Sequence, residues 1–167
     1  MNYLLEPSGD NSFSIVNADA NVYVGYVSWR GGAYHVSDHE DEDIAVVNSP
    51  DDALPIIATH YESVKWKRES ATRYSKFMEF GELRVDVEQP GQWVAYRNEF
   101  PLLRNGNPAT FPTFKEAQRA ADVHAREGYP NSETIFDGYA WSPDPDPWWS
   151  YPHRIAILRP GLLAFPS

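Results

Sequence analysis

The chain contains no cysteine among its 167 residues. It therefore has no disulfide framework and no thiol chemistry, which is typical of proteins of a reducing compartment. No apolar run approaches the roughly 20 residues that a membrane-spanning helix needs. The N-terminal residues Met1–Glu6 also lack the basic start and long apolar core of a secretory signal peptide. These absences predict a cytoplasmic protein that does not bind a membrane.

Basic residues are scarce in the first 62 positions, which contain eleven acids and a single base, Arg30. This segment alone accounts for a charge equal to the formal net charge of −10 of the whole chain. Residues 63–80 are different, with five bases and two acids. Because a negative field repels phosphate backbones and attracts basic partners, we expect the first segment to meet a basic protein surface.

Sequence motifs of common enzyme classes are also missing. There is no Gly-x-Ser-x-Gly nucleophile motif and no Gly-rich phosphate-binding loop. No pair of carboxylates can be singled out for catalysis among 24 acids. We therefore expect a non-enzymatic protein without a cofactor, and an enzyme with an unrecognised site remains the alternative.

What the chain does contain is an internal repeat. Tyr26–Arg30 matches Trp93–Arg97 at an offset of 67 residues, and Ser49–Ala53 matches Thr113–Ala117 at an offset of 64. A repeat of this length indicates one supersecondary unit that is duplicated. Each copy alone would be marginally stable, so we expect the two copies to pack together as a pseudo-dimer.

The expected fold class is α+β, with two tandem modules that each combine an antiparallel sheet and a helix. Alternating apolar residues and turn signals, among them a tight reversal at Gly31 and Gly32, predict three or four short strands before each helix. Ser49 with Asp52, and Thr113 with Glu116, resemble capping boxes at the two helix starts. The predicted organisation is a first module, a basic connector that is helical or irregular, a second module and a Pro- and aromatic-rich tail packed on the modules: residues 1–62, 63–81, 82–128 and 129–167.

Strand alternation divides the matched segments into two faces. We assign Val27 with Trp29, and Val94 with Tyr96, to the face that meets the helix. The opposite face then presents an aromatic ring and an arginine in each copy: Tyr26, Arg30, Trp93 and Arg97. Aromatic and arginine side chains dominate interface hot spots, so these residues are candidate binding residues. The alternative is that these faces pack on each other or under the tail.

The segment Asp38–Asp43 is a second candidate, because it places Glu40, Asp41, Glu42 and Asp43 in one predicted loop. It lacks the glycine and the closing glutamate of a calcium loop, so we predict a solvated acidic loop and no metal site. His60 and His124 occupy matching helix positions. We interpret them as satisfied core residues, with a paired-histidine site as the alternative.

The second copy also resembles a known module. The segment Gly91–Arg97, followed by Phe111–Ala121, is similar to the apetala-type DNA-binding module, which is also found in phage integrases. The resemblance implies a three-stranded sheet packed on one helix and DNA reading by sheet residues, here Trp93, Arg97 and Arg104. The chain departs from that pattern, because its third strand, Phe100–Arg104, is apolar rather than basic.

These observations lead to two functional hypotheses. The first is an interaction or regulatory protein whose acidic module binds a basic protein surface, in its sharpest form as a mimic of nucleic acid that inhibits a DNA-binding protein. The alternative is a nucleic-acid-binding accessory or regulatory protein that uses the sheet face of the second module.

Overall fold

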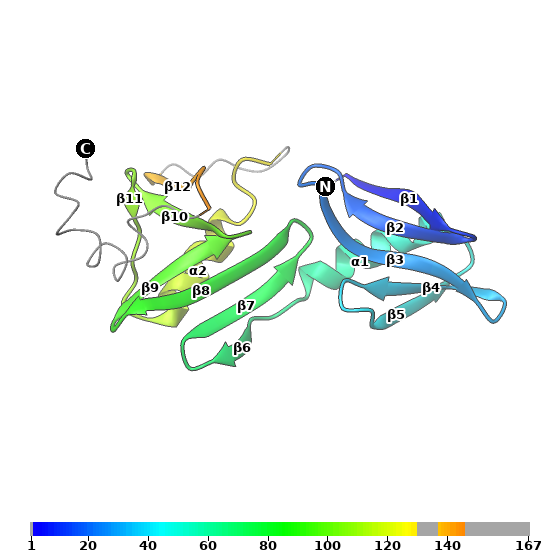
Figure 1. Ribbon diagram of the computed structural model, residues 1–167, viewed down its shortest axis with the longest axis horizontal. Helices are drawn as coiled ribbons and strands as arrows, with labels where there is room; N and C mark the ends of the chain where they lie inside the picture. The colour runs from blue at the N-terminus through cyan, green and yellow to red at the C-terminus, as the bar shows by residue number, and fades with distance from the viewer. Residues whose placement is uncertain (1, 130–136, 146–167) are drawn as a thin grey trace, which may run out of the picture. The chain divides into compact units, whose positions relative to one another are not determined.

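The computed structural model describes residues 2–129 and 137–145. These residues form an α+β fold with two antiparallel sheets and few helices (Figure 1). The predicted α+β class is therefore confirmed. The chain divides into two compact units. The described residues of the first unit are 2–66, 76–81 and 128–129, and those of the second unit are 67–75, 82–127 and 137–145.

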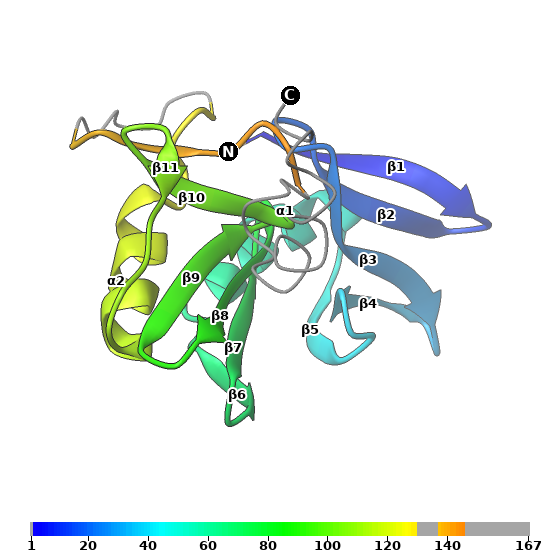
Figure 2. The same ribbon diagram turned by 60° about the vertical axis from the view of Figure 1, so that its left-hand side comes forward.

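The first unit contains a five-stranded sheet in which each strand pairs with the next one along the chain (Figure 2). Its strands are β1 (Tyr3–Gly9), β2 (Ser12–Asn17), β3 (Val22–Arg30), β4 (Ala33–Asp38) and β5 (Asp43–Val47). Gly31 and Gly32, the two residues between β3 and β4, have φ angles of 58° and 84°. Positive φ at both positions is what a two-residue hairpin turn requires, so the predicted tight reversal is confirmed.

A short 3₁₀ turn, Pro50–Asp52, leads into helix α1 (Ala53–Glu62). Ser49 makes no capping hydrogen bond with its side chain, so the predicted capping box at this helix is wrong. The proline that follows Ser49 has no N–H to donate and favours the tight 3₁₀ turn instead. Pro55 does not interrupt α1, because it lies in the first turn, where the backbone N–H has no helical partner.

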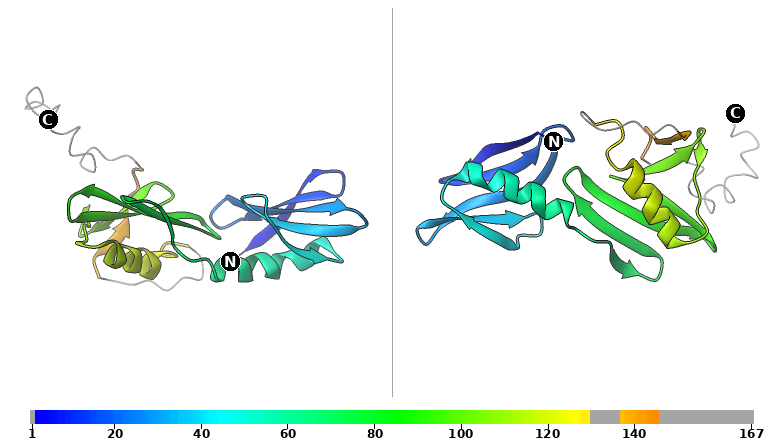
Figure 3. Two further views of the ribbon diagram at one scale, coloured as in Figure 1. Left: turned by 90° about the horizontal axis from the view of Figure 1, so that it is seen from below. Right: turned by 180° about the vertical axis from the view of Figure 1, so that it is seen from behind.

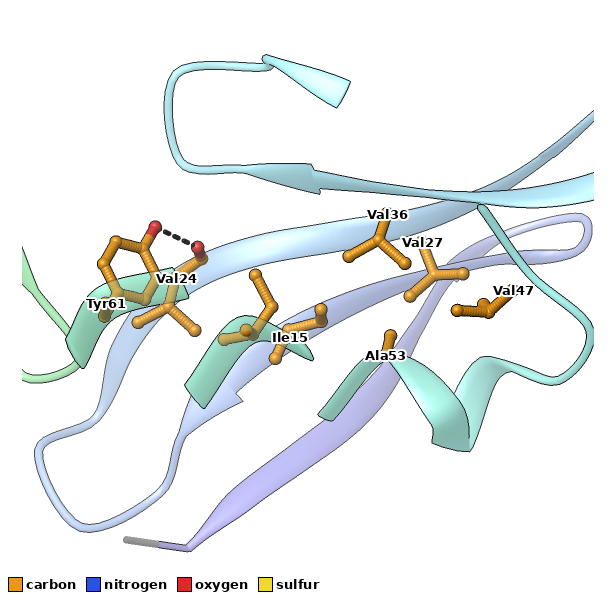
Figure 4. Close-up of a cluster of buried hydrophobic side chains, with 8 residues drawn as sticks. Ile15, Val24, Val27, Val36, Val47, Ala53 and Tyr61 are labelled. Atoms are coloured by element: carbon orange, nitrogen blue, oxygen red, sulfur yellow. Dashed lines mark hydrogen bonds between the residues drawn. The ribbon is translucent and has the colours of Figure 1, made fainter. Parts of the chain in front are cut away.

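Helix α1 covers one face of the first sheet (Figure 3). The core between them consists of Ile15, Val24, Val27, Val36, Val47, Ala53, Ile57 and Tyr61 (Figure 4). The hydroxyl of Tyr61 donates a hydrogen bond of 2.6 Å to the carbonyl oxygen of Val24, which ties the end of α1 to β3. At Gly25, a Cβ atom would lie 2.4 Å from the carbonyl oxygen of Ser37, so only glycine allows this close approach.

The second sheet has the strand order β11-β10-β9-β8-β7-β6, and β12 also pairs with β10. Its strands are β6 (Lys67–Ser70), β7 (Arg73–Met78), β8 (Gly81–Gln89), β9 (Gln92–Arg97), β10 (Phe100–Arg104), β11 (Asn107–Pro108) and β12 (Tyr139–Trp141). The boundary between the two units falls within β7. Helix α2 (Phe114–His124) packs on this sheet through Ala117 and Ala121, which are both fully buried.

The predicted cap of α2 is confirmed. The Oγ1 atom of Thr113 accepts a hydrogen bond of 3.2 Å from the backbone N–H of Glu116. The carboxylate of Glu116 lies 3.2 Å from the same Oγ1 atom. This arrangement satisfies one of the first N–H groups of the helix, which have no partner within it.

Two strands lie where no strand was predicted, in the basic connector. The prediction of a helix or an irregular segment there is wrong, because residues 67–70 and 73–78 are β6 and β7. All four residues of β6 are exposed, so it carries no apolar alternation that would reveal a strand. Lysine and other charged residues are common on such edge strands, because they discourage pairing with other chains.

Of the predicted tail, residues 129 and 137–145 are described, and β12 within them pairs with β10. Trp148, Trp149 and the expected strand Arg154–Leu158 lie outside the described residues.

Replacing Thr113 with alanine should lower the free energy of unfolding by about 1 kcal/mol, the usual cost of losing an N-cap. Ser49→Ala is the matched control, because Ser49 makes no side-chain cap bond. We expect it to change stability by less than about 0.5 kcal/mol. Urea denaturation of both variants checks this, and equal losses would contradict the assignment of the cap to Thr113 alone.

Candidate interaction surface

Because α1 covers one face of the first sheet, no helix among the described residues of the first unit lies on the other face (Figure 3). We call this other face the open face. Cross-strand neighbours on it form two rows, given by the strand register. One row is Leu4, Val16 and Tyr23, and the other is Glu6, Ser14, Tyr26, Ser37 and Asp43.

Tyr26 and Arg30 lie on the open face. Val27, which alternates with them along β3, is fully buried against α1. The predicted orientation of this strand is therefore confirmed. That Tyr26 and Arg30 bind a partner stays a prediction.

The acidic segment between β4 and β5 is a fixed turn. Asp38 is only 5% exposed, and its Oδ1 atom accepts hydrogen bonds from the backbone N–H groups of Glu40, at 2.9 Å, and Glu42, at 3.0 Å. Asp41 adopts a positive φ of 66°, which aspartate tolerates in turns. The turn leaves the side chains of Glu40, Asp41 and Glu42 exposed.

The last acid of the segment, Asp43, is paired within the chain. Its Oδ1 atom accepts hydrogen bonds from Nη2 of Arg30, at 2.7 Å, and from Oγ of Ser37, at 2.9 Å. The bond from Arg30, followed by that from Ser37, lowers the pKa of Asp43. The interpretation of Asp38–Asp43 as a wholly solvated loop is thus wrong at both ends, since Asp38 is buried and Asp43 is paired.

The negative charge of Asp41 in the turn acts on Tyr23, which lies on the open face. Burial raises the pKa of Tyr23, and the negative charge of Asp41 raises it further. Tyr23 is nevertheless 42% exposed. An exposed aromatic ring therefore lies within the field of the acidic turn.

A histidine cluster lies behind the acidic turn. The ring of His39 stacks on Phe77 with 3.7 Å between centroids, and its Nδ1 atom lies 3.0 Å from the hydroxyl of Tyr61. His60 on α1 places Nε2 3.6 Å from Oδ2 of Asp38. Among the residues that the structure describes, no three histidines or acids are grouped so that they could hold a metal ion. The contacts of His39 and His60 connect the acidic segment to Phe77, Tyr61 and α1.

His124 is a satisfied core residue, as predicted. It is 3% exposed, and its Nδ1 atom lies 2.9 Å from Oε2 of Glu127. Its carbonyl oxygen accepts a hydrogen bond from the indole of Trp141. His60 differs, because it is only partly buried. The two histidines therefore do not have equivalent surroundings.

In the second unit the predicted orientation of the matched strand is wrong. Nη1 of Arg97 donates hydrogen bonds of 3.0 Å and 2.6 Å to the carbonyl oxygens of Ala125 and Glu127, just beyond the end of α2. The ring of Trp93 contacts that of Phe114 on α2, with 5.9 Å between centroids. Both side chains therefore lie on the helix face rather than opposite to it.

Arg104, the third residue implied in DNA reading, has its guanidinium 5.3 Å from the ring centre of Tyr139 in β12. All three residues thus contact neighbours within their own unit. These contacts contribute to the packing of the second unit, and they reduce what Trp93 and Arg97 can offer to a ligand.

A charged cluster that the sequence did not reveal surrounds Arg84 in β8. Arg84 is 8% exposed, and it donates hydrogen bonds to Asp86, at 2.8 Å, and to Glu99. Its guanidinium lies 4.5 Å from the ring centre of Tyr96, whose hydroxyl donates to Glu88. The only sequence signal was the alternation of charge along β8, which also suits a solvent-exposed face.

An open pocket of about 360 Å³ lies beside this cluster. Its lining consists of Glu69, Ser70, Thr72, Arg73, Asp86, Val87 and Glu88. Arg73 and Asp86 satisfy each other through two hydrogen bonds, of 2.7 Å and 3.2 Å. Arg73, the one arginine of this lining, is therefore already paired with Asp86.

Comparison with protein-family models, curated proteins and solved structures found no match to this chain. Within the described residues, no helix is both long and apolar enough to cross a membrane.

Acidification should destabilise the protein through His39. Burial lowers the pKa of His39 below its ordinary value of 6.5, an effect that Glu40 and Asp38 oppose and His60 reinforces. Between the folded pKa and about pH 6.5 the unfolded chain holds the proton and the folded chain does not. The stability that this difference confers is complete above about pH 6.5 and is lost as the pH falls toward the folded pKa.

We therefore expect urea denaturation to give a smaller free energy of unfolding at about pH 5.5 than at about pH 7.5. His39→Phe can still stack on Phe77 but cannot titrate, so its stability should depend less on pH. Identical pH dependence in the two proteins would show that His39 is not responsible.

Proposed function

We propose that the protein is a non-enzymatic interaction protein whose acidic first unit binds a basic protein surface. In its narrowest form, this activity is competition with nucleic acid for the basic surface of a DNA-binding protein. The observation that supports the proposal most directly is the salt bridge of 2.7 Å between Arg30 and Asp43. Arg30 is the one base among residues 1–62. The exposed side chains of Glu40, Asp41 and Glu42 therefore have no arginine or lysine of that segment left to pair with.

The rigidity of the acidic turn supports this proposal. Asp38 accepts two backbone hydrogen bonds and thereby holds Glu40 and Glu42 in one conformation of the turn. A partner would then meet carboxylates whose backbone is already ordered. Pre-ordering reduces the entropy that binding costs, and charges of one sign increase the rate of encounter with a basic partner.

The second unit offers less support for the competing hypothesis of nucleic-acid binding. Arg97 donates to carbonyl oxygens that follow α2, and Arg104 lies over Tyr139. Each cation is engaged by its own unit. Exposed bases that could meet a phosphate backbone include Arg68 of β6 and its neighbour Lys67, whose Nζ atom lies 4.0 Å from Oε1 of Glu69.

We further propose that the two units are copies of one sheet-and-helix module. In support, Ala53 and Ala117, which are 64 residues apart, are both fully buried in their helices. The matched strands β3 and β9, however, turn opposite faces toward their helices. A shift of one residue exchanges the two faces of a strand. The two copies would therefore match at β3 and β9 only if one strand is aligned one residue out of step with the other.

Neutralising the acidic turn should slow association with a basic probe. For the variant that combines Glu40→Gln, Asp41→Asn and Glu42→Gln, we expect association with a labelled oligolysine peptide to slow roughly tenfold at low salt. The difference should shrink as salt is raised, because charges are screened beyond about 8 Å near physiological ionic strength. Stopped-flow fluorescence measures the rates, and unchanged melting would confirm that the fold is intact.

The control combines Asp10→Asn, Asp51→Asn and Asp52→Asn, which removes the same charge from exposed positions outside the turn. Equal slowing by both variants would assign the effect to net charge rather than to the turn. If the turn variant instead bound duplex DNA more tightly and kept its rate with oligolysine, nucleic-acid binding would become the better hypothesis.

A further inference from the structure

The open face of the first sheet presents more apolar surface than its acidic surroundings would suggest. Leu4, Tyr23 and Val46 are 45%, 42% and 61% exposed, and all three side chains lie on this face. Leu4, Val16 and Tyr23 are direct neighbours across β1, β2 and β3. Single exposed apolar residues are ordinary, but a connected row of them on an uncovered face indicates an interaction site.

Carboxylates flank this apolar row. The neighbouring row runs from Glu6 through Tyr26 to Asp43, so that an acid stands at each end and a tyrosine in the middle. Asp41 is close enough to Tyr23 to act on its ionisation. The open face therefore combines the rings of two tyrosines with carboxylates from both edges of the sheet.

We propose that the open face is the docking surface for an arginine-bearing segment of the basic partner, with guanidinium groups on the rings of Tyr23 and Tyr26 and on the carboxylates of Glu6 and Asp41. This inference rests on the proposed function and specifies its binding site. Arginine suits such a surface better than lysine, because its planar guanidinium stacks on aromatic faces and pairs with carboxylates in a fixed geometry.

The chain itself contains one such contact. The guanidinium of Arg30 lies on this face and donates to Asp43, which also accepts from Ser37. A guanidinium is therefore compatible with the carboxylates at this edge of the sheet. A partner's arginines would extend the same pairing toward Tyr26 and Tyr23.

The negative charge of residues 1–62 favours a basic polypeptide on the open face over a second copy of the chain or a nucleic acid. A second copy that docked through its own open face would bring residues 1–62, with eleven acids and one base, against the same segment, which is repulsive. A nucleic acid would bring phosphates against the same carboxylates. A basic polypeptide is the occupant whose charge complements the acids and whose arginine side chains can also cover Leu4, Val16 and Tyr23.

The test compares labelled oligoarginine and oligolysine peptides of equal length, which carry equal charge. Fluorescence anisotropy with the full chain should show tighter binding of oligoarginine. Tyr23→Ala and Tyr26→Ala should each weaken oligoarginine binding by about two- to fivefold, the range expected for one exposed cation–π contact. Tyr26→Phe retains the ring and should bind as the unmodified protein does.

Trp29→Ala is the matched control. Trp29 lies on the same strand as Tyr23 and has a similar exposure, 46%. It is nevertheless on the side of Val27, opposite to Tyr23, because a β-bulge between Tyr23 and Gly25 reverses the alternation. We expect its affinity for oligoarginine to be unchanged. Because Tyr23 is exposed, we expect Tyr23→Ala to keep the melting temperature of the unmodified protein. If Tyr26→Ala fails to fold, the result for Tyr23→Ala still decides the test.

The outcomes separate this inference from the proposed function. If both peptides bind equally and the tyrosine variants are unchanged, the open face is not the docking surface, although an acidic protein that binds basic partners remains supported. If neither peptide binds the unmodified protein, both proposals are overturned. A loss of affinity in Trp29→Ala equal to that in Tyr23→Ala would also overturn the assignment to the open face.

Discussion

The buried carboxylate of Asp38 makes the interactions on which the acidic turn and its connection to the sheet depend. One of its oxygens fixes the acidic turn through the N–H groups of Glu40 and Glu42, and the other faces His60 on α1. Asp38 also pairs with Gly25 in the strand register, where only glycine allows the strands to approach. A single side chain thus connects the sheet, the helix and the turn. Without it, the exposed carboxylates would belong to a loop of no fixed conformation.

Local patterns in the sequence predicted much of the fold. Gly31 and Gly32 mark a hairpin turn, and Thr113 with Glu116 marks a helix start, because each is a short-range device that acts within a few residues. Strands without such signals were missed. β1 contains Pro7 at a sheet edge, and β6 is exposed throughout, so neither strand has the alternation that burial of one face imposes.

The orientation of the matched strand was predicted correctly in the first unit and wrongly in the second, and the difference has one physical cause. Alternation separates two faces of a strand but does not say which one meets the helix. In β3 the large Val27 lies under α1. In β9 the face toward α2 carries Ala95, a small residue that lets the helix approach, while Tyr96 packs on Arg84 across the sheet. Choosing the helix face by side-chain size therefore succeeded once and failed once.

The two units differ in how far their charged side chains are paired within the protein. In the second unit Arg73 and Arg84 both donate to Asp86, and Arg97 donates to carbonyl oxygens beyond α2. Cations and acceptors there satisfy one another, and a ligand would have to displace existing contacts to gain new ones. In the first unit Arg30 satisfies one carboxylate only. Glu40, Asp41 and Glu42 are exposed, and residues 1–62 contain no further arginine or lysine that could pair with them, so a partner's cations would not have to displace such a base. The exposed carboxylates of the first unit could therefore attract a basic partner, whereas the charges of the second unit named above already attract one another.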